Sequence, residues 1–381
     1  MHTRKGLLLV LVLFVVALLA MSACVPAAAP LAPTPTKAPA PAATPVPQAA
    51  TPTAAAKPAS APATQTPAPP PTVKVRFASP GFVSDAGVFI ALEKGYFKQE
   101  GIDLELVTLK TAADAPPLLA RGDVEVAGGS TSAALYNAII RGIDMKIVAD
   151  KGVHPKGLGW QFIAVRKDLA DQIKKPADLK GRNIALSCSN CSVDYFLLVV
   201  LKQAGLTLKD VETVDLAVPD QLAAFGNKSI DAGILVEPNA ATAAERGLAV
   251  SWISIDQVDP GNQAAVIIMS PTFVNSIDAA RRFAVAYVKG LRDYNDAFVK
   301  NKGKTEIISI LTKYTSVKDP TVYEKVVLAA LNPDGALNIE SLVQQQEFFV
   351  ERGGMTSRVD LKKAIDTQFV DFAVQKLGKY Q

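Results

Sequence analysis

Hydrophobic and polar positions alternate between two periods from residue 73 onward. Segment 73–78 places apolar residues at every second position, which predicts a strand. Segment 84–94 and the residues after it place Phe89 and Tyr96 on one face of a helix. Segment 103–109 alternates again. The start of this region therefore predicts a strand, a helix and a second strand.

The same succession continues through most of the chain. Further strands are expected at 123–129, 145–149, 161–166, within 181–191, at 213–217, 230–238, 249–253 and 264–269. Helices are expected at 115–121, 130–141, 193–204, 219–225, 239–246, 276–301, 304–314, 319–331, 338–352 and 361–376. Strands separated by helices of this length are typical of mostly parallel sheets. The long C-terminal helices have apolar faces, and we expect them to pack on the first sheet.

A weak internal echo divides this region into two halves. The stretches "ARGDVEVAGGS" and "GNKSIDAGILVEP" both run from a helix through a tight turn and an acidic residue to a strand and a loop. We predict an α/β fold with two lobes, each a mostly parallel sheet flanked by helices. Lobe 1 is expected to begin with 73–159 and to be completed by 263–381, with a strand that crosses back, and lobe 2 to comprise 160–262.

The N-terminus has the features of an export signal. Arg4 and Lys5 precede a 14-residue apolar run, and small residues then lead to Cys24. A basic start, a short apolar core and small residues before a cut predict a signal peptide over residues 1–23, and the run is too short to be a good membrane span. A cysteine at this place resembles the lipobox of bacterial lipoproteins, which implies that Cys24 is lipidated. An ordinary signal peptide with a chance cysteine is the alternative.

Residues 24–72 consist mainly of Ala, Pro and Thr. This composition cannot bury a core and predicts a disordered, extended segment. At about 3.1 Å per residue, its reach is at most on the order of 150 Å. We interpret it as a tether that holds the folded part on the outer side of the cell membrane, although a spacer without a selected length explains it equally well.

Composition excludes several classes of function. The net charge of +4 is small, and no basic cluster with interleaved aromatic residues predicts a nucleic-acid partner. After Cys24 only Cys188 and Cys191 remain, and the two histidines are His2 and His154. We therefore expect no metal site and no cofactor. The C-x-x-C pair leaves a local disulfide, free thiols and a redox role open. No nucleophile elbow, phosphate loop or catalytic set with histidine is present, so we expect a binding protein rather than an enzyme.

Four loops at strand ends are the candidate binding site, because ligands in open α/β sheets bind outside the carboxyl ends of the strands. They lie at 79–82, 128–132, 187–192 and 237–239. Glycines and hydroxyl residues at 128–132 precede a helix, whose free N–H groups suit a polar or anionic group, although ordinary capping explains them as well. Aromatic residues near the cleft suit a flat ring, although core packing explains Trp160 as well. The candidate ligand-binding residues are Ser79, Phe82, Asp85, Gly129, Ser130, Thr131, Trp160, Ser189, Asn190, Tyr195 and Glu237, with Asp150 and Asp194 as further hydrogen-bond acceptors.

Four stretches resemble a known family. "GVFIALEKGYFKQEGIDLELV", "LLARGDVEVAGGS", "ADLKGRNIAL" and "GILVEPNAATAAERG" are similar to the solute-binding proteins of bacterial ABC importers for sulfonates, nitrate, thiamine pyrimidine precursors and riboflavin. The resemblance covers roughly residues 73–265 well and the C-terminal helices loosely. It implies a type II periplasmic-binding-protein fold, in which two lobes close around a ligand, and an ABC permease as partner of a monomeric receptor.

The family also contains a thiamine-pyrimidine synthase. That branch, and the binders of the pyrimidine, typically carry a histidine just before the glycine of the first helix, where this chain has Asp85. The iron-binding cysteine run of the synthase is not matched by Cys188 and Cys191. This departure argues against the enzyme and weakens the pyrimidine assignment. Aromatic residues and neutral polar loops favour a flat heteroaromatic ligand, riboflavin first. A sulfonate or nitrate would need a basic partner near 128–132, and a sensory module is a further alternative.

Overall fold

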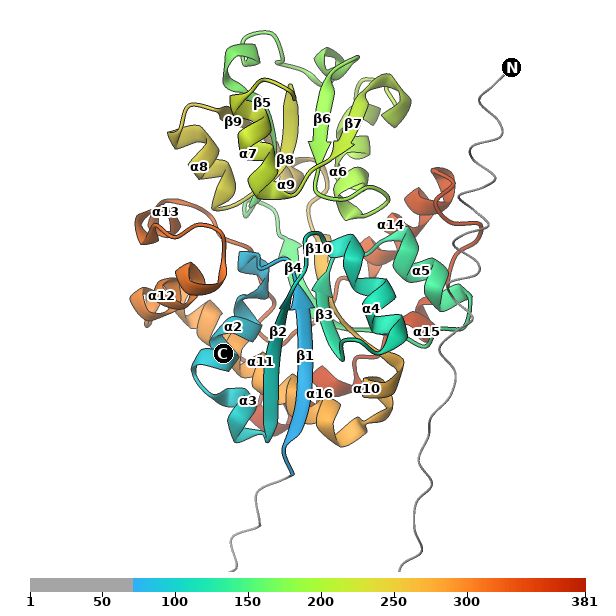
Figure 1. Ribbon diagram of the computed structural model, residues 1–381, viewed down its shortest axis with the longest axis vertical. Coiled ribbons are helices and arrows are strands. Elements are labelled where there is room, and N and C mark those ends of the chain that lie inside the picture. The colour runs from blue at the N-terminus through green and yellow to red at the C-terminus, as the bar shows by residue number, and fades with distance from the viewer. Residues whose placement is uncertain (1–70) are drawn as a thin grey trace, which may run out of the picture. The chain divides into compact units, whose positions relative to one another are not determined.

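In residues 71–381, ten strands form two five-stranded sheets, with the orders β2-β1-β3-β10-β4 and β7-β6-β8-β5-β9 (Figure 1). The structure is a computed structural model that describes residues 71–381, all within one compact unit. The predicted signal peptide, Cys24 and all but the last two residues of the predicted tether lie outside the described residues.

The strands of the first sheet, which defines lobe 1, are β1 Val73–Ser79, β2 Ile102–Thr108, β3 Val126–Gly129, β4 Lys146–His154 and β10 Asn262–Met269. The strands of the second sheet, which defines lobe 2, are β5 Gln161–Arg166, β6 Asn183–Leu186, β7 Glu212–Asp215, β8 Ala232–Val236 and β9 Ala249–Ser254. In lobe 1, β10 runs antiparallel to β3 and β4, and the other strands share one direction. In lobe 2, β5 is the reversed strand. The predicted class, two lobes with mostly parallel sheets, is confirmed.

Helices flank both sheets (Figure 1). Those between the strands are α2 Ala86–Glu93, α3 Tyr96–Gln99, α4 Ala115–Arg121, α5 Ala133–Ile140, α6 Ser192–Lys202, α7 Val218–Gly226, α8 Asn239–Glu245 and α9 Ile255–Val258. After β10 follow α10 Pro271–Asn275, α11 Ile277–Phe298, α12 Lys304–Tyr314, α13 Pro320–Lys325, α14 Ile339–Glu351, α15 Leu361–Ala364 and α16 Gln368–Leu377. None of the helices in residues 71–381 combines the length and the apolar character that a membrane span needs.

The C-terminal helices cover lobe 1, as their apolar faces predicted. Phe283 and Leu291 of α11 and Phe369 of α16 share one buried apolar cluster with Val75 and Phe77 of β1. Lobe 2 has its own core between its sheet and α6. Each lobe therefore has a buried apolar core that stabilises its sheet.

Two neighbouring segments connect the lobes. The chain leaves lobe 1 after β4 and returns from α9 into β10. His154 pairs with Asn262, and Gly261 donates its N–H to the carbonyl of His154 over 2.7 Å. A pair of adjacent crossover segments is the arrangement expected of a hinge between two lobes.

The predicted helix at 319–331 is wrong over its second half. The helix α13 ends at Lys325, and the following chain runs along β4, where Val153 donates its N–H to the carbonyl of Ala330 over 3.0 Å. Asn332 then donates its N–H to the Asp150 carboxylate over 2.7 Å. Leu328, Ala329 and Leu331 of this stretch are buried in the apolar cluster of lobe 1 without forming a helix, so their hydrophobicity was assigned to the wrong element.

Candidate functional site

The ends of four strands and the starts of two helices enclose a small cavity between the lobes. Its volume is about 40 Å³. Lobe 1 and the returning strand β10 contribute Pro80, Phe82, Ser84, Ala112, Gly128, Gly129, Ser130, Lys151, Ala264 and Ala265. Lobe 2 and the first crossover contribute Trp160, Gln161, Ser187, Ser192, Val193, Val218 and Val236. The cavity therefore lies at the carboxyl ends of β1, β3, β6 and β8, where open α/β sheets bind ligands.

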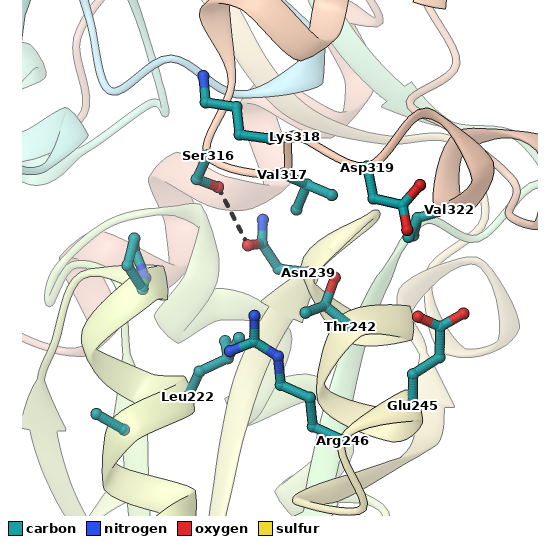
Figure 2. Close-up of a pocket in the computed structure, with 12 residues that line it drawn as sticks. Leu222, Asn239, Thr242, Glu245, Arg246, Ser316, Val317, Lys318, Asp319 and Val322 are labelled. Carbon is teal, nitrogen blue, oxygen red and sulfur yellow. Dashed lines mark hydrogen bonds between the residues drawn. The ribbon is translucent and has the colours of Figure 1, made fainter.

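A larger cavity of about 660 Å³ lies at the rim of the lobe interface. It opens between α7 and α8 of lobe 2 and residues 316–322 of lobe 1. A hydrogen bond of 3.2 Å from the hydroxyl of Ser316 to the side chain of Asn239 connects the two sides (Figure 2). Its charged side chains, Glu245, Arg246, Lys318 and Asp319, belong to exposed residues. Because these charges stay solvated and no strand end reaches the groove, we take the inner cavity as the candidate site.

A buried ion pair lies beneath the inner cavity. The ammonium of Lys151 is 3.1 Å from Oδ1 of Asp85 and donates a hydrogen bond of 2.8 Å to the hydroxyl of Ser84. The side chains of Lys151 and Asp85 are 2% and 0% exposed. Oδ2 of Asp85 accepts hydrogen bonds from the hydroxyl of Ser79, over 2.8 Å, and from the N–H of Phe82, over 3.0 Å. Burial raises the pKa of Asp85, while Lys151 and these donors oppose the shift.

Trp160 forms one wall of the cavity. Its indole N–H donates to the carbonyl of Val153 over 3.0 Å, and its ring stacks on His154 with the ring centroids 4.3 Å apart. Burial lowers the pKa of His154 to about 3, so the imidazole stays neutral at ordinary pH. Trp160 is held at both its polar edge and one face, which fixes the ring in the wall of the cavity.

Several predicted residues come together at the cavity. Phe82, Gly129, Ser130 and Trp160 line it. The ring of Phe82 also packs against an apolar cluster of lobe 2. Ser79 and Asp85 lie one layer below, in the network around Lys151. These six candidates thus occupy one region, although they come from both lobes.

The other predicted residues lie away from the cavity lining. The hydroxyl of Thr131 donates to Gln345 of α14, and the hydroxyl of Ser189 donates to Asp215 over 2.7 Å. Tyr195 packs edge-on against Phe348, with the ring centroids 5.6 Å apart. On α6 the residues that line the cavity are Ser192 and Val193, whereas the ring of Tyr195 packs on α14.

Asn190 and Glu237 hold backbone groups. The carbonyl of Asn190 accepts the N–H of Ala133 from lobe 1 over 3.0 Å. The carboxylate of Glu237 accepts the N–H of Ala241 in α8 over 3.0 Å. Burial raises the pKa of Glu237 to about 7. Both residues lie near the lobe interface and act on the backbone there.

The two further predicted acceptors also bind protein groups. Asp150 accepts the N–H groups of Gly152 and Asn332 and the side-chain amide of Gln263. Asp194 accepts the N–H of Asn190 over 2.6 Å and pairs with Arg352 at 2.5 Å. Burial raises the pKa of each of these two carboxyls to about 6. Both carboxylates connect separate segments of the chain around the cavity.

The two cysteines of the C-x-x-C pair form a disulfide between Cys188 and Cys191. Both residues are buried in the core of lobe 2. Of the three alternatives that the spacing left open, the structure has the local disulfide. Across residues 71–381, no three side chains of His, Cys, Asp or Glu gather into a group that could hold a metal ion.

Sequence reasoning missed the charged residue of the site. Lys151 lies in β4 within "IVADKGVH", where it follows a run of buried residues. A lysine inside a buried strand is rarely found without a partner, and this was the available signal. The list of candidate residues also lacked three polar residues of the lining, because neighbouring residues of the same stretches were chosen instead. These three are Gln161, Ser187 and Ser192.

Comparisons with known proteins place the chain in a family. The model of the family described as "NMT1/THI5 like" matches residues 84–296, which is more than half of the chain. The chain belongs to this family. The matched residues include the helix α2, which follows β1, both crossover segments and nearly all of α11.

Solved structures share the fold of this NMT1/THI5-like protein. The alkanesulfonate-binding protein of Xanthomonas axonopodis pv. citri, bound to MOPS, is 18% identical with a TM-score of 0.64, over 78% of this chain and 99% of that chain. The periplasmic nitrate-binding protein of Synechocystis PCC 6803 is 15% identical with a TM-score of 0.62, over 81% of this chain and 89% of that chain. The fold that the resemblance implied is confirmed.

One protein that is similar in sequence is named for a biosynthetic role rather than for binding a solute. A protein of Haemophilus influenzae named for thiamine biosynthesis is 28% identical over 130 residues. This match covers 34% of the present chain and 39% of the relative, so it spans well under half of either protein.

Proposed function

We propose that this chain is the substrate-binding protein of an ABC importer, which captures a small molecule outside the cytoplasm and delivers it to a membrane permease. The observation that carries the proposal is the inner cavity, because both lobes line it and the chain passes between them in two adjacent crossover segments. Structural neighbours named as alkanesulfonate- and nitrate-binding proteins support it.

Capture would proceed by closure of the lobes and without covalent chemistry. A cavity of about 40 Å³ is too small for a ring-sized ligand, so binding such a ligand requires the lobes to move apart. The hydrogen bonds and ion pairs between the lobes would break in that movement. Two of them are backbone hydrogen bonds, from Ala133 to Asn190 and from Ser192 to Thr131.

For the ligand we propose a flat heteroaromatic vitamin or precursor, with riboflavin first and the thiamine pyrimidine second. Trp160 and Phe82 offer ring faces and edges at the cavity, and serine, glutamine and glycine supply neutral polar contacts. An alkanesulfonate or nitrate is the alternative, which the two named neighbours favour.

A thiamine-pyrimidine synthase is the alternative of another class, and the relative named for thiamine biosynthesis favours it. It differs from the receptor in one observable: the enzyme converts its ligand, and the receptor releases it unchanged. Mass spectrometry of the solute after incubation with the protein distinguishes them.

The anchor and the location are part of the same proposal. Cys24 would carry the lipid, the Ala/Pro/Thr-rich segment would act as tether, and the monomeric receptor would work on the outer face of the cell membrane. Palmitate labelling of cells that produce the protein should be lost in Cys24→Ala, which should also release the protein from the membrane fraction.

A ligand screen by thermal shift tests the receptor. The full-length protein is unfolded and refolded to remove carried-over ligand, then melted with riboflavin, the thiamine pyrimidine, an alkanesulfonate or nitrate. A ligand at 100 times its dissociation constant stabilises by about 2.7 kcal/mol. A shift with riboflavin supports the first choice, a shift only with an anion supports the alternative, and no shift with any solute counts against the receptor.

A further inference from the structure

From the buried Lys151–Asp85 pair we infer that the cleft is charge-compensated, so that it selects an uncharged solute with a hydrogen-bond acceptor and excludes small anions. The inference rests on the proposed role of the cleft in solute capture. It goes further by assigning the specificity to two residues and by fixing the charge of the solute at the point where it meets Lys151.

Lys151 has a donor to spare. An ammonium carries three N–H donors. The hydroxyl of Ser84 takes one, at 2.8 Å, and the carboxylate of Asp85 lies 3.1 Å away. Lys151 also lines the cavity, so the remaining N–H is available to an oxygen or ring nitrogen of a solute.

Asp85 is held in place as the counter-charge. Its second oxygen accepts from the hydroxyl of Ser79 and the N–H of Phe82. With the ammonium, these donors favour the ionised carboxylate and oppose the burial that raises the pKa of Asp85. Gly128 leaves the space for this pair, because a Cβ on it would come within 2.5 Å of Cε of Lys151 and 2.6 Å of Oδ1 of Asp85.

The charges at the cavity sum to zero. Lys151 is the one charged side chain among the residues that line it, and Asp85 lies directly behind. A neutral solute that accepts a hydrogen bond keeps the net charge of Lys151, Asp85 and the solute at zero. An anion would bring it to −1 in a closed site, which is costly without a further partner. A flat ring with carbonyl oxygens meets this condition, whereas nitrate and alkanesulfonates do not.

Removal of the counter-charge should create an anion site. Asp85→Asn leaves the ammonium of Lys151 uncompensated, so nitrate and methanesulfonate should bind this variant at least tenfold more tightly than the wild type. Titration calorimetry in chloride-free buffer at pH 6 measures both affinities. In Asp85→Asn/Lys151→Met the gain should disappear.

Asp114→Asn is the matched control. Asp114 also accepts the N–H of the residue three positions earlier, Thr111, over 3.0 Å, but it is exposed. The control changes the net charge by the same amount and should bind anions no better than the wild type.

Two results would overturn the inference. One is a folded Asp85→Asn protein that gains no affinity for either anion. The other, which needs no variant, is a wild-type protein that binds nitrate or methanesulfonate at micromolar concentration. Neither depends on whether riboflavin binds, so a failure of this inference is distinguishable from a failure of the proposed function.

Discussion

Ser192 donates its backbone N–H to the carbonyl of Thr131 over 3.2 Å, and the two residues belong to different lobes. Next to them, Ala133 donates its N–H to the carbonyl of Asn190 over 3.0 Å. These bonds join the starts of α5 and α6, so N–H groups that an isolated helix leaves free are satisfied across the cleft. Closure of the lobes is thus coupled to the ends of the helices that border the cavity.

Arg352 reinforces the same junction, and its removal should loosen it. Its guanidinium is 2.5 Å from the carboxylate of Asp194, whose side chain is 0% exposed. Arg352→Ala leaves this carboxylate buried without its cation. Because Arg352 itself is partly exposed, we expect a loss of about 2 kcal/mol in the free energy of unfolding, between surface and buried pairs. Urea unfolding followed by circular dichroism measures it.

The matched control for this pair is Arg358→Ala. Arg358 pairs with Glu347 at 3.3 Å, and both side chains are at least half exposed. This change should cost less than about 1 kcal/mol. Equal losses in the two variants would show that Arg352 does not stabilise the junction between the lobes.

Glu237 should make stability depend on pH. Burial raises its pKa from 4.5 to about 7. Between these values the folded protein holds a proton that the unfolded chain has lost, so this contribution to stability is lost as pH rises through the window. Glu237→Gln removes it. The variant should match the wild type near pH 4 and be more stable by up to about 3 kcal/mol at pH 8.

Melting temperatures across pH 4–8 measure this difference. Glu245→Gln is the control, because Glu245 lies on the same segment of chain at an exposed position. It makes the same change of side chain without burial, so the difference from the wild type should grow more steeply with pH for Glu237→Gln than for this control. A difference for Glu237→Gln that stays constant with pH would contradict a raised pKa at this residue.

Trp160 should contribute strongly to the affinity for a ring. Trp160→Ala removes a fixed aromatic wall of the cavity, and we expect the affinity for a flat heteroaromatic solute to fall at least tenfold, as the loss of an aromatic contact implies. Trp252→Ala is the control, because Trp252 packs on the core of lobe 2 away from the cavity. An unchanged affinity in Trp160→Ala, measured by calorimetry, would remove this residue from the site.

Adjacent glycines should respond differently to a methyl group. A Cβ on Gly128 would lie 2.5 Å from Lys151, 2.6 Å from Asp85 and 2.9 Å from Phe77. A Cβ on Gly129 would meet its nearest atom, the carbonyl oxygen of Ala112, at 3.5 Å. Gly128→Ala should therefore destabilise by about 1–3 kcal/mol, as overpacked sites do. Gly129→Ala should melt within a few degrees of the wild type, and a reversed order would contradict the packing around the ion pair.

The local pattern of the sequence predicted most of the elements and the return of one strand from lobe 2 to the sheet of lobe 1. The strand at 264–269 was expected to cross back to lobe 1, and β10 pairs there with β3 and β4. The pattern failed at 326–331, which is not helical and pairs with β4 at Ala330. Periodicity alone does not separate a short buried helix from an extended apolar segment.

The site was harder to predict because it depends on which side of each loop faces the cleft. In the loop before α6, Ser187 and Ser192 line the cavity, whereas Ser189 turns toward Asp215. Asn190 adopts a left-handed conformation, with φ of 53°, within a bend of the chain. Lys151 was missed because its role comes from Asp85, which lies 66 positions earlier in the sequence.

Hydrogen exchange at the junction of the lobes tests the central claim, solute capture by closure, most directly. The amides of Ala133 and Ser192 donate across the cleft, so both report whether the lobes are together. With a saturating concentration of the solute found in the thermal screen, exchange in the peptides that contain these amides should slow at least tenfold relative to the refolded, solute-free protein. Unchanged exchange at both amides under saturation would contradict closure around the solute.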